Sequence, residues 1–252
     1  MNEREVELYL PAGVASSPLF LERLRQVIGR GLEETGAIVH SSLAFPYGDR
    51  ERSVIGQLRE VGRDLRLRGR RLDGALGGNR LLAWIDERRR VLQGDSAAPA
   101  RTIIVGHSAG GVAAVHAARL LYARDGGEPP LVVMIGSPRC RIPEELREHV
   151  LYVYAARSDS QGARWMTVKP TDPITRLGSF GGWHIGRWSL PRWQMDKHAP
   201  VHASGLRIVG GHADYFREQP PYLNAMGLSN MAVTAEVVLN WINQRLLWNL
   251  EG

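Results

Sequence analysis

The sequence predicts an α/β fold, with a mainly parallel central sheet and helices on both faces. Three observations lead to this prediction. Short apolar runs alternate along the chain with segments of helical periodicity. The run Thr102–Val105 is continuously apolar, as is typical of a strand at the centre of a parallel sheet. A glycine-rich turn follows that run directly and opens a helix of small residues at Ala109–Arg124.

Six strands are expected from the apolar runs. In the first, apolar residues alternate with polar or aromatic ones, and the second is closed by a Pro-Tyr-Gly turn. The later strands are short, apolar and separated by helical segments, which indicates βαβ units. In chain order the expected strands are Val6–Leu10, Ala37–Phe45, Thr102–Val105, Leu131–Ile135, Leu151–Ala155 and Leu206–Val209.

The helices are expected from spacing and from end signals. For the first one, Ser17 is a natural N-cap, Pro18 suits the first helical position, and apolar residues recur with helical spacing over Phe20–Ile28. Gly29, Gly31 and Gly36 are expected to bring that helix to an end. The other expected helices are about Ser53–Leu67, with the apolar stripe Val54, Leu58, Val61 and Leu65, then about Asn79–Leu92, Ala109–Arg124, a short Glu144–Glu148 and about Met231–Leu247.

Residues 1–252 are expected to form a single domain, since the sequence has no internal repeat and no convincing boundary. The stretch 157–205 departs from the strand–helix alternation and is rich in Trp, Gly, Pro and Arg. We interpret it as an inserted, lid-like segment over the carboxyl edge of the sheet. Its tryptophans would either form a wall near the active site or pin a long loop through a small apolar cluster. They are Trp165, Trp183, Trp188 and Trp193.

Composition bounds the class of protein. The chain is 44% hydrophobic and 23% charged, as in ordinary globular proteins. Cys140 is the single cysteine, so no internal disulfide can form. No apolar run approaches the roughly 20 residues that span a bilayer. The first residues are not those of a signal peptide, and we expect a cytoplasmic protein.

The formal net charge is +6, and arginines cluster at 66–71 and 88–90. One interpretation is an anionic partner such as a phospholipid surface or nucleic acid. The other is a solvated surface, which the interspersed acidic residues favour. We therefore expect no nucleic-acid partner. Peripheral membrane contact is an alternative that no other feature of the sequence supports. No feature of the sequence indicates an oligomeric state.

One motif carries a specific chemistry. Between the strand Thr102–Val105 and the helix at Ala109 stands Gly106-His107-Ser108-Ala109-Gly110. A serine on a strained strand-to-helix turn, with glycines on either side, is the arrangement of a nucleophile elbow. The following helix directs its free N–H groups at a developing oxyanion. The motif predicts Ser108 as a nucleophile and the Ala109 N–H as an oxyanion donor.

A serine needs a base, and the base needs an orienting acid. His212 is the candidate base, because it follows the last expected strand and precedes a long helix. Two acids are open. Asp159 comes soon after the strand Leu151–Ala155. If residues 158–162 form a hairpin tip and 164–168 its return strand, Asp159 lies away from the sheet and Asp172 returns to it. This path favours Asp172.

With these residues, the chain resembles the α/β-hydrolase superfamily. The order of serine, acid and histidine matches that of the family, and the resemblance covers the chain from Val6 to the last helix. Three segments resemble the lipase-like branch with the fungal-lipase pattern, where a segment like Asp-(Ile or Val)-x-Arg-Leu holds the acid, which supports Asp172. The acid of that branch follows its strand more closely, which favours Asp159, and this chain lacks the signal and disulfides of secreted lipases. The segments are Gly106–Gly111, Gly136–Arg139 and Asp172–Leu177.

The family also implies a second oxyanion donor in the loop after the first strand. Val14 takes the place after the glycine in the family's His-Gly-x pattern, although the histidine is absent here. The alternative is a tight turn with no catalytic part.

The sequence as a whole predicts a carboxylic ester hydrolase of the esterase or lipase type, acting through an acyl-enzyme on a small-molecule ester or acyl substrate. No metal or organic cofactor is expected. His184, His198 and His202, with Asp196, have no spacing typical of a metal site. The alternatives are an acyltransferase or thioesterase using the same triad, or a binding protein that has kept the fold.

Overall fold

A computed structural model describes residues 4–67, 69–93, 101–157, 160–161, 170–185 and 190–247. Over these residues, six strands form a parallel sheet, and a seventh pairs antiparallel at one edge. The sheet is therefore mainly parallel, as predicted. Its order is β2 (Ala37–Ala44), β1 (Arg4–Pro11), β3 (Arg101–His107), β4 (Leu131–Ile135), β5 (Val150–Ala155), β9 (His202–Leu206) and β6 (Ser160–Gln161).

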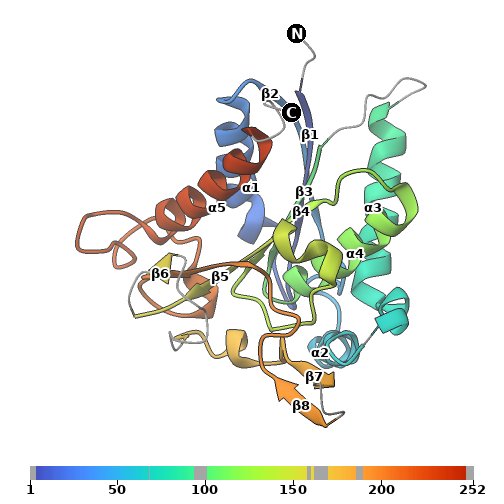
Figure 1. Ribbon diagram of the computed structural model, residues 1–252. Helices are drawn as coiled ribbons and strands as arrows, with labels where there is room; N and C mark the ends of the chain where they lie inside the picture. Colours follow the sequence, from blue (N-terminus) through green and yellow to red (C-terminus); the bar gives the residue numbers. More distant parts are fainter. Residues whose placement is uncertain are drawn as a thin grey trace.

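Helices cover both faces of the sheet (Figure 1). On one face lie α1 (Pro18–Glu33) and α5 (Asn230–Leu247). On the other lie α2 (Val54–Asp64), α3 (Leu76–Gln93) and α4 (Ala109–Asp125). The sheet is buried between these layers, and every residue of β4 and β5 is buried, which explains their unbroken apolar sequences.

Short elements complete the chain. The 3₁₀ turns are η1 (Gly69–Gly74), η2 (Glu144–His149), η3 (Ile174–Arg176) and η4 (His212–Asp214). A separate two-stranded ribbon consists of β7 (Gly182–Ile185) and β8 (Pro191–Gln194). No helix in the described ranges is both long and apolar enough to cross a membrane.

The last strand of the parallel sheet was placed wrongly by the sequence. It is β9, which pairs with Leu151–Ala155 of β5, rather than Leu206–Val209. The run Leu206–Val209 is the more strand-like in composition, but the Val209 N–H donates to the Asn230 side chain instead of to a strand. Since β9 belongs to the sheet, the inserted segment ends before His202 rather than at 205. The expected return strand at 164–168 lies outside the described residues.

Two helices also differ from expectation. Gly29 and Gly31 lie inside α1, which continues to Glu33. Gly31 marks a close approach of α1 and α5, because a Cβ there would lie 2.5 Å from Leu239 Cδ1. In α2 the stripe is only half right: Val61 is buried, whereas Val54 and Leu58 are 45% and 55% exposed.

Candidate active site

Ser108 occupies a strained turn between β3 and α4. Its φ is 56° and its ψ −131°, a region that costs a residue with a Cβ free energy. The Ser108 N–H donates to the Ile135 carbonyl of β4 (2.9 Å). The flanking glycines leave room for this turn: a Cβ at Gly106 would lie 2.5 Å from the backbone of Gly110, and one at Gly110 would lie 2.0 Å from the Pro11 oxygen. The turn thus has the shape of a nucleophile elbow.

Ser108, His212 and Asp172 form a continuous hydrogen-bonded chain. The Ser108 Oγ lies 3.0 Å from His212 Nε2, and His212 Nδ1 lies 2.8 Å from Asp172 Oδ2. With the imidazole proton on Nδ1, His212 donates to the carboxylate, and its Nε2 accepts from the serine hydroxyl. The Asp172 side chain is fully buried, whereas that of His212 is 27% exposed. The geometry can therefore pass a proton from Ser108 to His212 beside a buried negative charge.

The chain returns Asp172 to the sheet edge through backbone pairing with the end of β5. Ala156 pairs with Pro170 in an isolated bridge, and the Thr171 N–H donates to the Ala155 carbonyl (2.8 Å). Asp172 is thus the acid that contacts His212, while its rival Asp159 lies outside the described residues.

Tyr215 is a site residue that the sequence reasoning missed. Its hydroxyl donates to Asp172 Oδ2 (3.1 Å) and accepts from the Ala155 N–H (2.8 Å). Burial, and then the charge of Asp172, raise the pKa of Tyr215 well above its ordinary value, so the group remains a neutral donor. The other carboxylate oxygen accepts from the Ile174 N–H (2.9 Å). The sequence offers only the nearness of Tyr215 to His212, three residues earlier, which does not reveal its contact with Asp172.

His107 packs against the back of His212. The two rings stack with centroids 4.9 Å apart at 26°, and the His107 Nε2 lies 3.2 Å from the His212 carbonyl oxygen. Phe20, Tyr215 and Phe216 surround His107. Burial lowers the pKa of His107 to about 3, so the ring stays neutral and can donate to that carbonyl. His107 thereby holds the turn that carries His212.

The loop after β1 reaches the nucleophile. A Cβ at Gly13 would lie 2.6 Å from Ser108 Cβ, so only glycine allows this approach. Val14 follows it and is half-buried, and the Ala15 N–H donates to the Gln57 side chain of α2 (3.1 Å). Ala109 is the first residue of α4 and is buried. Oxyanion binding by the Ala109 and Val14 N–H groups stays a prediction that this arrangement allows.

The remaining candidates lie apart from this chain of hydrogen bonds. Trp183 and Trp193 pack edge-to-face on the β7–β8 ribbon, with centroids 5.5 Å apart, while Trp165 and Trp188 lie outside the described residues. Cys140 is buried, and burial raises the pKa of its thiol to about 12. In the described part of the chain, no group of three or more His, Cys, Asp or Glu side chains could hold a metal ion.

Comparisons with known proteins give weak likenesses. No protein-family model and no curated protein matches the chain. Among solved structures, Arabidopsis thaliana SOBER1 is 15% identical, with a TM-score of 0.49 over 96% of this chain and 99% of that one. The peroxisomal α/β-hydrolase Lpx1 from Saccharomyces cerevisiae is 16% identical, with a TM-score of 0.35 over 57% of this chain and 39% of that one. The RedJ thioesterase from Streptomyces coelicolor is 15% identical, with a TM-score of 0.29 over 65% and 46%.

The fold assignment rests on the architecture itself. Parallel strands with helices on both faces, and a serine in a strained turn between a central strand and the next helix, are features of the α/β-hydrolase fold. The architecture of the described residues therefore is that of an α/β-hydrolase fold.

Proposed function

We propose that this protein is a serine hydrolase that cleaves carboxylic esters through an acyl-enzyme on Ser108. One observation carries the proposal: the hydrogen-bonded chain from Ser108 Oγ through His212 to the buried Asp172. Nothing in the stability of the fold calls for a serine with a φ of 56° beside a histidine and a buried carboxylate. Such strain is commonly retained for function, which supports an enzymatic role.

In the proposed reaction, His212 Nε2 takes the proton of the Ser108 hydroxyl as Oγ attacks the ester carbonyl. The carbonyl oxygen becomes an oxyanion, which would accept hydrogen bonds from the Ala109 and Val14 N–H groups. His212 then gives its proton to the leaving alcohol as the C–O bond breaks. Asp172 stabilises the transient imidazolium without taking its proton.

Water completes the cycle. His212 removes a proton from a water molecule, the resulting hydroxide attacks the acyl-enzyme, and the carboxylic acid leaves as the Ser108 hydroxyl is restored. The residues present suffice for every step. Tyr215 and His107 do not touch the substrate in this scheme; they hold Asp172 and His212 in position.

Hydrolysis of p-nitrophenyl esters of increasing acyl length tests the proposal. We expect measurable turnover by the wild type and its loss, by a factor of about a thousand or more, in Ser108→Ala. Ser42→Ala is a matched control, because Ser42 lies on β2 and contacts Trp84 rather than the site. Equal turnover by wild type and Ser108→Ala would overturn the proposal.

A further inference from the structure

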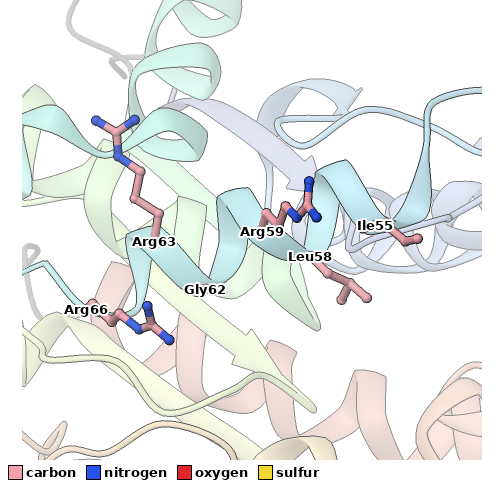
Figure 2. A pocket seen from close by; sticks show the side chains of 6 residues that line it. All are labelled: Ile55, Leu58, Arg59, Gly62, Arg63 and Arg66. Carbon is pink, nitrogen blue, oxygen red and sulfur yellow. The ribbon is translucent and has the colours of Figure 1, made fainter.

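The outward face of α2 combines exposed aliphatic residues with arginines. Ile55 is 64% and Leu58 55% exposed, and they line one groove with Arg59 and Arg63 of α2 and with Arg66, which lies just after the helix. Figure 2 shows these side chains on α2 and on the segment that follows it, with Gly62, which has no side chain, among them. Together they line a groove of about 390 Å³. The sequence placed Leu58 in the core, so its exposure is a departure from an ordinary amphipathic helix.

The three arginines bring positive charge that nearby carboxylates do not cancel. Within the ranges that the structure describes, none of their guanidinium groups lies within ion-pair distance of an acid. Glu60 of the same helix forms ion pairs with Arg52 and Arg80 instead (2.6 and 2.7 Å). Asp64 is buried and accepts from Tyr47 and from the Leu76 and Gly77 N–H groups. The exposed face of α2 is therefore cationic.

This face lies beside the candidate active site. The opposite side of α2 holds the loop after β1, because Gln57 accepts from the Ala15 N–H, and Gly13 two residues earlier approaches Ser108. The exposed Ile55 belongs to the same turns of the helix as Gln57. The apolar end of the groove therefore lies on the helix that holds the loop next to Ser108.

A second element exposes apolar residues at the same end of the molecule. On and beside the β7–β8 ribbon, Trp183 is 57%, Leu190 73%, Trp193 42% and Met195 62% exposed. The segments that carry this ribbon and α2 pack on one buried cluster, through Phe180, Ala199 and Val61. Figure 1 shows α2, β7 and β8 together at the end towards which the central parallel strands run.

We propose that α2 and the β7–β8 ribbon form a docking surface for an anionic phospholipid bilayer. Aliphatic and tryptophan side chains suit the boundary between headgroups and acyl chains, and arginines suit the phosphates above it. A nucleic acid would match the arginines but not the exposed Ile55, Leu58 and Leu190. In the docked orientation the end of the sheet that carries Ser108 would face the lipid, and the use of that orientation for catalysis, unlike binding, rests on the proposed hydrolase function.

Vesicle sedimentation with the Ser108→Ala variant tests the docking without interference from hydrolysis. We expect binding to vesicles of equal parts phosphatidylcholine and phosphatidylglycerol, weakened by salt, and little binding to phosphatidylcholine alone. Arg59→Gln with Arg63→Gln and Arg66→Gln should weaken binding about a hundredfold, because each arginine near an anionic surface contributes about fivefold. Ile55→Ser with Leu58→Ser should weaken it at least about tenfold.

The matched controls lie at the other end of the molecule, where α1 and α3 end and the parallel strands β2 and β3 begin. Arg30→Gln with Arg88→Gln and Arg90→Gln removes the same charge. Val91→Ser with Leu92→Ser removes aliphatic residues that are 67% and 48% exposed. Both controls should bind like Ser108→Ala itself. Equal binding to the two kinds of vesicle, no binding to either, or equal weakening by a control set would each overturn the proposal. Vesicle binding alongside inactivity towards esters would leave docking intact and reject the hydrolase.

Discussion

At the scale of single residues, the carboxylate of Asp172 has the most demanding surroundings. It is buried and accepts from His212, Tyr215 and the Ile174 N–H. We expect Asp172→Asn to lower kcat on p-nitrophenyl esters by about a thousandfold or more, because an amide neither fixes the imidazole tautomer nor stabilises the imidazolium. Asp159→Asn is the matched control and should stay close to wild type. A crippled Asp159→Asn with an active Asp172→Asn would reject this assignment.

Tyr215 should act through Asp172 rather than on the substrate. Tyr215→Phe removes one donor to Asp172 and the acceptor of the Ala155 N–H, so we expect kcat to fall about tenfold and the free energy of unfolding by about 1–3 kcal/mol. Tyr47→Phe is the control, since Tyr47 is a buried tyrosine that donates to a buried aspartate, Asp64, away from Ser108. It should lose similar stability with kcat unchanged. A loss of stability without a loss of kcat in Tyr215→Phe would assign it a purely structural role.

The three residues of the hydrogen-bonded chain were candidates from the sequence, because their signals are local or ordered along the chain. Ser108 has a five-residue motif between a strand and a helix, and Asp172 and His212 follow in the expected order. The contacts of Tyr215, His107 and Gly13 could not be predicted in the same way. They depend on how the turns after different strands converge in space, which no local pattern encodes.

At the scale of elements, the turn at Ser108 depends on close contact between α4 and β1. Gly110→Ala would place a Cβ 2.0 Å from the Pro11 oxygen, a backbone atom that cannot move aside cheaply. We expect the free energy of unfolding, measured in urea, to fall by about 3 kcal/mol or more. We also expect the rate of ester hydrolysis to fall. Gly29→Ala, in the interior of α1 where nothing lies within 4 Å of the new Cβ, should stabilise by about 0.5–1 kcal/mol. An equally stable Gly110→Ala protein would contradict the packing.

The elements also show where sequence patterns stop being informative. The central strands were predictable because both faces of the sheet are covered, so their residues are uniformly apolar. The last strand was not predictable, because His202–Leu206 contains few of the residues that favour strands. It is a strand because it pairs with β5. The stripe of α2 failed for another reason: helical spacing identifies an apolar face but does not say whether the fold covers it.

At the scale of the whole molecule, two buried histidines tie stability to pH. Burial lowers the pKa of His107 to about 3 and that of His116 to about 4. The unfolded chain binds protons at these residues below about pH 6.5, whereas the folded protein does not until the lower pKa is reached. Their contribution is therefore present above about pH 6.5 and is lost as the pH falls, by up to about 1.4 kcal/mol per pH unit for each histidine.

Urea unfolding between about pH 7 and pH 5 tests this coupling. His116→Gln removes one titrating group from α4 without touching the hydrogen-bonded chain of the site. We expect its unfolding free energy to fall less steeply with decreasing pH than that of the wild type, by about the contribution of one histidine. Identical slopes would mean that His116 is protonated in the folded protein.

The proposed chemistry requires that His212 activates Ser108 as a nucleophile. Labelling with a fluorophosphonate, followed by intact mass and peptide mapping, measures this activation, because the reagent phosphonylates an activated serine whatever the natural substrate. We predict one adduct per chain, on Ser108, which is absent in Ser108→Ala and forms far more slowly in His212→Gln. No adduct on the wild type, or an adduct on another residue, would mean that Ser108 is not an activated nucleophile.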